Sequence, residues 1–389
     1  MNEQKTVLAL LLTNIFIAFL GIGLVIPILP TLMRELGVNG TVVGYLTAAF
    51  AIAQLICSPF AGKAADKIGR KKVLVTGLFL FGFSEVLFGL GREIEILFLA
   101  RILGGVSSAL IMPAVTAFIA DITTLEARPK ALGYMSAAIN TGFIIGPGIG
   151  GFLADFGTRT PFFFAGVLGA VAALLSIIFL KEPERSNKAV AEVPELKTSI
   201  KRMLAPMYFI AFTLILIASF GLSAFESFFA LFVDGKFFFT PKEIAFVITA
   251  GALLGALIQV LLFERLARRW GEVKLIRYSL ILSGVLIFLL TTVHSYVWIL
   301  LVTTLAFIGF DLFRPAVTSY LSKIAGNEQG FVGGMNSMFT SLGNIFGPII
   351  GGMLFDVNID YPFYFSVTVM ILGVIITLFW KESSRILQQ

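Results

Sequence analysis

The stretch GFIIGPGIGGFLADFGTRTPFFF at residues 142–164 returns in the second half of the chain as GNIFGPIIGGMLFDVNIDYPFYF at residues 343–365. The recurring residues, each with its counterpart, include Gly142 (Gly343), Gly146 (Gly347), Pro147 (Pro348), Gly150 (Gly351), Gly151 (Gly352), Asp155 (Asp356), Pro161 (Pro362), Phe162 (Phe363) and Phe164 (Phe365). This recurrence indicates an internal duplication, and in membrane proteins such repeats form two halves around a shared pathway.

The composition predicts that most of the chain lies in a lipid bilayer. Hydrophobic residues make up 58% of the 389 residues and charged residues only 13%, whereas a soluble domain has about 25% charged residues. Apolar runs of about 18 to 25 residues recur, each long enough to cross roughly 30 Å of hydrocarbon. We place twelve membrane spans, six on each side of residue 190, at 7–29, 42–61, 73–91, 96–120, 131–154, 161–180, 207–233, 243–263, 275–292, 297–320, 331–355 and 362–380.

The basic residues alternate between loops, which predicts how the chain is oriented. They gather in every second loop, at Lys63, Lys67, Arg70, Lys71, Lys72, Lys181, Arg185, Lys188, Lys197, Lys201, Arg202, Arg265, Arg268, Arg269 and Lys274. The opposite loops hold fewer, at Arg34, Arg92, Arg159, Lys236 and Lys242. This positive-inside pattern places both termini in the cytoplasm. It accounts for the net charge of +6 without a nucleic-acid partner.

Several function classes lack their sequence signals. Cys57 is the only cysteine, so no intramolecular disulfide can form. The lone His294 lies in a short loop, where we interpret it as a solvated residue and not a proton relay. The chain has no Walker loop and no Cys/His ligand cluster, so we expect neither ATP-driven transport nor a metal or other cofactor. The first apolar run has no small-residue cleavage site, and we interpret it as a retained span.

The repeat extends beyond the opening stretch and predicts the domain organisation. Residues 113–116 (PAVT) return as 315–318, so the first six spans correspond to the last six. Six spans separate the copies, which makes this a parallel repeat with its axis along the membrane normal. We therefore expect an all-α membrane protein with two six-helix bundles, at residues 1–180 and 207–389. Residues 181–206, rich in Glu, Lys and Pro, form the predicted cytoplasmic linker.

The glycines of the repeat are spaced four apart, which gives each helix a smooth face. The two stripes are Gly142, Gly146 and Gly150, and Gly343, Gly347 and Gly351. Another backbone can approach such a face closely, and the prolines Pro147 and Pro348 favour a kink. Two interpretations stay open: static helix packing, or a pivot that packs tightly in one state and loosens in another.

Four motifs resemble those of the major facilitator superfamily, and they occur in the expected order. The loop at 62–72 (GKAADKIGRKK) resembles the GxxxDxxGRK/R loop, which involves Gly62, Asp66, Gly69 and Arg70. The segment 99–105 resembles the RxxxG motif of the superfamily, and 142–151 resembles its antiporter motif. The segment 23–30 resembles the span-one motif of the twelve-span branch. The chain is most similar to multidrug efflux pumps of Gram-positive bacteria, of the Bmr and NorA type.

That resemblance implies the major facilitator fold and export of lipophilic, often cationic compounds in exchange for protons, by alternating access. It implies a monomer in the cell membrane. The second half departs from the loop motif, because Arg268 stands where Asp66 would fall. We hypothesise that Asp66 docks near residues 329–334, at a helix N-terminus that attracts anions, and latches the cytoplasmic side. The alternative is that Asp66 is an ordinary solvated charge.

Few ionisable residues fall inside the predicted spans, and such residues are functional candidates because burying them is costly. They are Glu85, Arg101, Glu226, Asp311 and Arg314. Phenylalanines 225, 228, 229 and 232 flank Glu226, and such surroundings favour the protonated carboxyl. A cationic drug nearby would favour the ionised form, so drug and proton would compete for Glu226. The alternative is a structural ion pair with Arg101.

Two other charged residues carry open alternatives. Asp311 and Arg314 are three apart and share a helix face, so they form either a structural ion pair or a cavity-facing second proton site at Asp311. On resemblance, Arg101 senses the carboxylates and tunes their proton affinity; alternatively, it pairs with Glu85. The expected proton-coupling residues are therefore Glu226, Asp311 and Arg101.

Aromatic and polar residues inside the spans are the candidates for contacting a flat, apolar substrate, since aromatic faces also attract cations. Those predicted to bind substrate are Phe19, Gln54, Tyr134, Asn140, Phe143, Glu226, Phe307, Asp311 and Asn344. Apolar walls with few fixed hydrogen bonds suit many ligands weakly. Two alternatives remain: export of one native metabolite or lipid-like molecule, and a polytopic membrane enzyme or sensor, for which no catalytic constellation is found.

Overall fold

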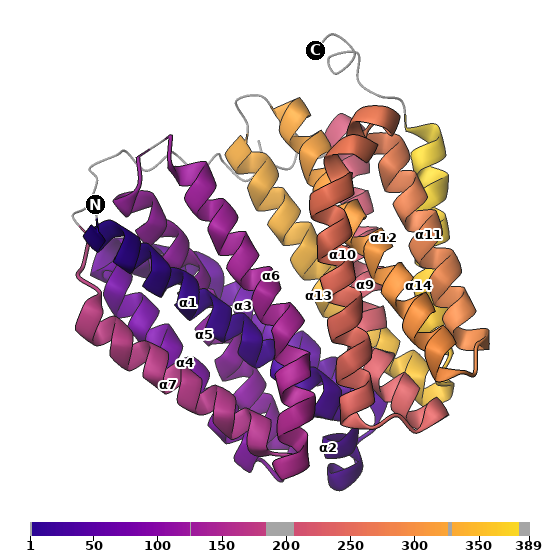
Figure 1. Cartoon of the computed structure of the whole chain (residues 1–389), viewed down its shortest axis with the longest axis horizontal. Helices are drawn as coiled ribbons and strands as arrows, with labels where there is room; N and C mark the ends of the chain where they lie inside the picture. Colours follow the sequence, from indigo (N-terminus) through magenta and orange to yellow (C-terminus); the bar gives the residue numbers. More distant parts are fainter. Residues whose placement is uncertain (1, 125, 184–205, 326–328, 381–389) are drawn as a thin grey trace. The chain divides into compact units, whose positions relative to one another are not determined.

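The computed structural model describes residues 2–124, 126–183, 206–325 and 329–380, and the regular elements within these ranges are helices (Figure 1). Within the same ranges, 12 helical segments are long and apolar enough to span a membrane. The predicted linker at 181–206 lies outside the described residues from 184 to 205. The chain is therefore a multi-pass membrane protein, as the hydropathy of the sequence predicts.

The helices of the first half begin with α1 (Asn2–Val25), the 3₁₀ turn η1 (Ile26–Ile28) and α2 (Leu29–Leu36), and continue with α3 (Gly40–Ile68), α4 (Arg70–Leu90), α5 (Ile94–Ile122), α6 (Arg128–Leu153), the 3₁₀ turn η2 (Ala154–Phe156) and α7 (Thr160–Phe179). Those of the second half are α9 (Pro206–Phe237), α10 (Pro241–Trp270), α11 (Glu272–Thr292), α12 (Tyr296–Ala325), α13 (Gln329–Val357) and α14 (Tyr361–Phe379).

The helices coincide with the predicted spans, but several continue beyond the apolar runs. The span predicted at 243–263 belongs to α10, which continues to Trp270 through charged residues. The span predicted at 7–29 is interrupted instead, because Pro27 and Pro30 lack the N–H groups that a continuous helix needs. The chain there passes through η1 into α2, and Gly37 ends α2 with a left-handed φ of 62°.

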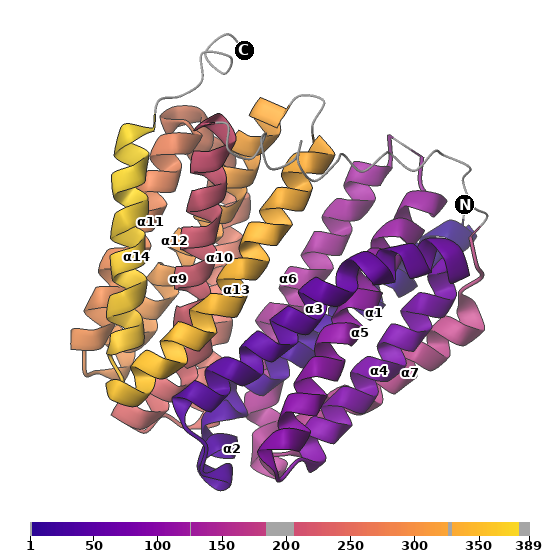
Figure 2. The same ribbon diagram turned by 180° about the vertical axis from the view of Figure 1, so that it is seen from behind.

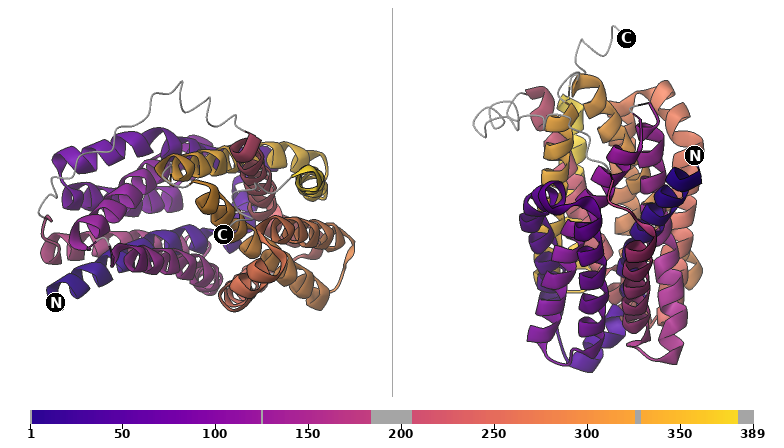
Figure 3. Two further views of the ribbon diagram at one scale, coloured as in Figure 1. Left: turned by 90° about the horizontal axis from the view of Figure 1, so that it is seen from above. Right: turned by 90° about the vertical axis from the view of Figure 1, so that its left-hand side faces the viewer.

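The chain forms two compact units. One contains residues 1–38, 46–189 and 238–249, and the other contains 39–45, 190–237 and 250–389, in each case as far as they are described. The long helices of each unit lie side by side as a bundle, which the turned views also show (Figures 2 and 3). In the first unit, α1 packs on α6, and α4 packs on α5 and α7. In the second, α9 packs on α13, and α11 packs on α12 and α14. The sequence repeat is therefore also a repeat of helix packing.

The glycine stripes form close helix contacts within each unit. A Cβ atom added at Gly146 of α6 would lie 2.7 Å from the carbonyl oxygen of Leu20 on α1. One added at Gly347 of α13 would lie 2.7 Å from the carbonyl oxygen of Phe220 on α9. The predicted close backbone approach is confirmed, and Pro147 and Pro348 lie inside helices that continue past them. Whether these contacts also act as pivots remains a prediction.

Candidate functional site

Glu226 lies well inside α9, on a more accessible face than the phenylalanines that flank it in the sequence. Its side chain is exposed, whereas Phe225, Phe228, Phe229 and Phe232 are fully buried. The Phe225 ring packs on Phe229, Phe307, Phe310 and Phe363, with centroids 5.6 to 6.2 Å apart. The four rings face the interior of the bundle while the carboxylate lies on another face, because a helix turns about 100° per residue.

Three charged side chains of the second unit come together on α9 and α12. Glu226, Asp311 and Arg314 are near enough for their charges to interact. Asp311 is half-buried, and its carboxylate lies so close to Gly255 of α10 that a Cβ atom there would overlap it. Among the residues that the structure describes, none of the three forms an ion pair. The proposed Asp311–Arg314 pair is therefore not formed.

A cavity of about 140 Å³ lies in the second unit beside these charges. Leu222, one turn before Glu226, and Arg314 contribute to its lining. Its other lining residues come from α9, α12 and α13 and are Ile215, Ala218, Ser219, Phe310, Phe313, Val317, Thr318, Asn336 and Thr340. Sequence reasoning missed Asn336 and Thr340, although their spacing of four with Asn344 marks one polar helix face.

Arg101 and Glu85 lie in the first unit, on α5 and α4. The guanidinium carbon of Arg101 lies 4.5 Å from the centroid of the Phe88 ring, a cation–π contact. Glu85 is near enough for the two charges to interact, but neither side chain forms an ion pair in the described parts of the chain. The simple Arg101–Glu85 pair is therefore not formed. The tuning role of Arg101 remains a prediction.

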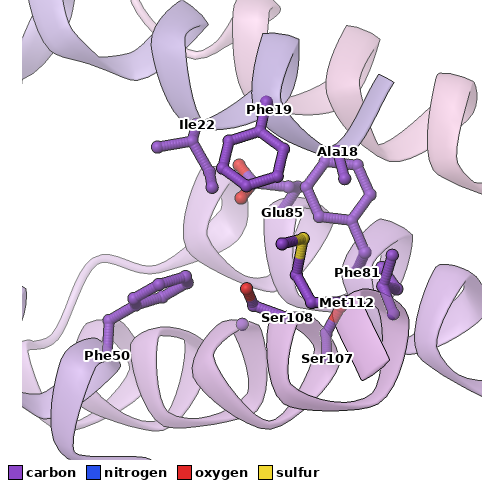
Figure 4. Close-up of a pocket in the computed structure, with 11 residues that line it drawn as sticks. Ala18, Phe19, Ile22, Phe50, Phe81, Glu85, Ser107, Ser108 and Met112 are labelled. Atoms are coloured by element: carbon purple, nitrogen blue, oxygen red, sulfur yellow. The ribbon is translucent and has the colours of Figure 1, made fainter. Parts of the chain in front are cut away.

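Of the predicted substrate residues of the first unit, Phe19 lines a small cavity (Figure 4), and Phe143 and Gln54 each contact a residue of its wall. The Phe19 and Phe143 rings make an edge contact, with centroids 5.0 Å apart. The Gln54 amide donates a 2.8 Å hydrogen bond to the hydroxyl of Ser108. Both Phe19 and Ser108 line the cavity, which has a volume of about 20 Å³.

The remaining predicted substrate residues are more scattered. Tyr134 and Asn140 are exposed on α6, and the Lys130 ammonium lies 5.9 Å from the Tyr134 ring. Asn344 is exposed on α13. Phe307 packs on the buried Phe225, with centroids 5.8 Å apart. None of these four lines either cavity described above.

The loop motif of the first half forms a charged network centred on Arg70. Its guanidinium pairs with Asp66 and, at 3.1 Å, with Asp121 at the end of α5. The Glu182 carboxylate accepts the backbone N–H groups of Arg70 and Lys71, the latter at 3.1 Å. Gly69 allows this turn with a φ of 123°. Sequence reasoning missed Asp121 and Glu182.

Two other expectations about this loop have different outcomes. Gly62 has open space where a Cβ atom would lie, so close packing does not require a glycine there. The proposed docking of Asp66 on residues 329–334 remains a prediction, and the side chains of 329 and 330 lie outside the described residues.

Comparison with known proteins identifies the family. The chain matches the Major Facilitator Superfamily profile at residues 11–238 and 211–389. It is 64% identical over 386 residues to Multidrug resistance protein 1 of Bacillus subtilis (strain 168), covering 99% of both chains. It is 46% identical to Quinolone resistance protein NorA of Staphylococcus aureus (strain N315), covering 98% of this chain and 97% of that one.

Solved structures share the fold at low sequence identity. A bacterial homolog of the human lysosomal transporter Spinster, in an inward-facing and occupied conformation, superimposes with a TM-score of 0.82 at 15% identity, covering 98% of this chain and 100% of that one. The nucleoside transporter NupG superimposes with a TM-score of 0.79 at 16% identity, covering 97% of this chain and 98% of that one. The twelve spans, the repeated packing and these matches together show that the chain belongs to the Major Facilitator Superfamily.

Proposed function

We propose that the protein is a transporter without catalytic activity that exports lipophilic, often cationic compounds in exchange for protons. The observation that carries the proposal is the cluster of Glu226, Asp311 and Arg314, which lies inside membrane spans without an ion pair among the described residues. Ionisable groups at such depth are costly and mark ion or proton pathways. Relatives named for multidrug and quinolone resistance support drugs as substrates.

The coupling follows from competition for the carboxylates. An ionised Glu226 attracts a cationic substrate, while its protonated form has no charge to hold one. Substrate arrival therefore helps to release a proton, and proton return helps to release the substrate. Arg314 lies near both acids, and its positive charge partly offsets their negative charges while the carboxylates are ionised.

The 140 Å³ cavity supports a substrate site with more than one kind of contact. Phe310 and Phe313 offer apolar surface, and Thr318, Asn336 and Thr340 offer hydrogen-bonding groups. Such mixed lining, without a dense set of fixed polar partners, suits weak binding of varied ligands. The cavity would hold part of a drug-sized molecule, since whole ligand pockets measure about 300–1,000 Å³.

The proposal includes the location and the direction of transport. The alternation of basic loops supports both termini in the cytoplasm. A proton gradient across the cell membrane would then drive protons inward and substrate outward. The protein would work as a monomer, with residues 1–180 and 207–389 rocking about the pathway and 181–206 joining them.

Everted membrane vesicles with an acidified lumen test the function directly. Addition of a lipophilic cation such as ethidium should dissipate the proton gradient, read by a fluorescent pH probe. Vesicles with the same amount of Glu226→Gln protein, and vesicles without the protein, are the matched controls. If the gradient responds to no lipophilic cation, the proposed function is wrong.

A further inference from the structure

A buried acid of the first unit has no hydrogen-bond or ion-pair partner among the residues that the structure describes. Glu85 of α4 is only 8% exposed. In the described part of the molecule, its carboxylate takes part in no hydrogen bond or ion pair. Figure 4 shows that the carboxylate points towards Phe19 and Ile22 of α1, at the edge of the small cavity. An ionised carboxylate buried in this way is costly unless something in the cavity binds it.

The cavity has the size of one water molecule. Its volume is about 20 Å³, and about 10–15 Å³ of such volume is enough for a water. The aromatic walls are Phe19, Phe50 and Phe81, so a drug-sized molecule does not fit. The occupant that fits the space and the carboxylate is therefore a water molecule that can carry a proton.

Two serines supply the polar part of the cavity wall. The Ser107 hydroxyl donates a 2.9 Å hydrogen bond to the carbonyl oxygen of Gly77 and is thus already used. The Ser108 oxygen accepts a hydrogen bond from Gln54, which leaves its own proton to be donated. Among the described groups, that proton has no acceptor. A water in the cavity could accept from Ser108 and donate to Glu85.

The charges around Glu85 are few. On α5, Arg101 is near enough to interact electrostatically. The neighbouring α7 carries no ionisable side chain. On α1, Glu3 and Lys5 precede the cavity residue Ala18 by 13 residues or more, or about 20 Å at the rise of an α-helix. Among the described residues, Arg101 is the charge whose interaction with Glu85 offsets the cost of an ionised carboxylate, and it does so without a hydrogen bond.

We propose that Glu85 is a further proton-binding residue, reached through one water held by Ser108 in this cavity. A hydronium ion delivers the proton to a carboxylate oxygen and leaves water behind, and the reverse step releases it. The site belongs to the first unit, whereas Glu226 and Asp311 belong to the second. The proposal deepens the proposed function, on which its role in transport rests, but proton binding itself can be measured without transport.

Infrared difference spectroscopy on the purified, full-length protein tests this. The carbonyl stretch of protonated carboxyl groups is followed during a pH titration in a Glu226→Gln/Asp311→Asn background. We expect one buried carboxyl group to titrate there and to vanish when Glu85→Gln is added. Glu95→Gln, an exposed acid on α5, is the matched control and should leave the signal unchanged. Glu85→Asp should restore a titrating group.

The outcomes separate the alternatives. An unchanged signal in Glu85→Gln overturns the proposal, and so does a signal that responds to Na⁺ at constant pH. If Glu85→Gln does not fold, Ser108→Ala replaces it and should move the midpoint of the titration, whereas an unmoved midpoint overturns the role of the water. A titrating Glu85 in a protein that fails the vesicle test would reject the proposed function and keep the proton site.

Discussion

The carboxylate of Asp356, at the end of α13, accepts a 2.7 Å hydrogen bond from the backbone N–H of Gly40, the first residue of α3. It also accepts the N–H of Thr41 at 2.9 Å and the hydroxyl of that residue. The first turn of a helix has N–H groups without helical partners and a partial positive charge, so a carboxylate there stabilises it. The repeat-related Asp155 instead pairs with the ammonium of Lys242 near the start of α10.

This difference predicts unequal effects on stability. Asp356→Ala leaves two backbone N–H groups of the helix start without this acceptor and should lower the free energy of unfolding by about 1–2 kcal/mol. Asp155→Ala breaks an exposed ion pair and should cost less than about 1 kcal/mol. Thermal unfolding in detergent, followed by tryptophan fluorescence, measures both. Equal losses, or a larger loss at Asp155, would contradict the assigned roles.

The glycine stripes predict a strong contrast among Gly→Ala variants. Alanine at Gly146 or Gly347 would push against the backbone of α1 or α9, and overpacking of this kind costs about 1–3 kcal/mol. Alanine at Gly62 meets open space and should be neutral or gain up to about 1 kcal/mol from helix propensity. The amount of folded protein and its thermal midpoint report the contrast. If alanine at both Gly146 and Gly347 leaves the thermal midpoint unchanged, the tight packing of these two helix pairs is refuted.

The acidic cluster predicts separate effects on coupling and on folding. Glu226→Gln should insert normally, because its exposed side chain has no ion pair to lose, and should abolish proton-coupled efflux. Transport is measured against pH for Glu226→Gln, Asp311→Asn and the double variant. A single-site mechanism fails if each single variant abolishes coupling. If Glu226→Gln mainly lowers the amount of inserted protein, the acid is structural.

Hydropathy alone predicts the positions of the membrane spans, because a bilayer requires long apolar runs whichever helices they pack against. The ends of the helices were harder to predict, since the backbone hydrogen bonds continue into water. In α10 the helix passes Arg265 and Arg268 and ends only before Gly271, whose φ is 76°. Charged residues there lower the hydropathy but do not oppose the helix.

The charged residues of the site were also visible in the sequence, since Glu226 and Asp311 stand out in apolar runs. The surroundings of these acids cannot be predicted from the sequence, because the direction of a side chain depends on which helix face the bundle covers. The four phenylalanines that flank Glu226 in the sequence are buried in the bundle, whereas the acid lies on a more accessible face. Asp121 and Glu182 resembled ordinary acids near span ends, and only the fold brings them to Arg70 and to the backbone of its turn.

Substitution of Asp66 distinguishes a role in latching the cytoplasmic side from a role in the local structure of the loop. Asp66 and Asp121 both pair with Arg70, so a purely local role predicts similar effects for Asp66→Asn and Asp121→Asn. The latch predicts a greater effect for Asp66→Asn on transport rate and on access from the cytoplasm. Access can be followed with a membrane-impermeant maleimide on a cysteine placed at Thr318, in the lining of the larger cavity.

The background for this measurement is Cys57→Ser, because Cys57 is the only native cysteine. We expect Asp66→Asn to raise the labelling rate from the cytoplasmic side several-fold and to slow efflux, because the helix N-terminus would lose its anionic partner. Asp121→Asn should change both only slightly, since Asp66 still holds Arg70. If Asp66→Asn leaves transport rate and labelling untouched, Asp66 is an ordinary surface charge held by Arg70.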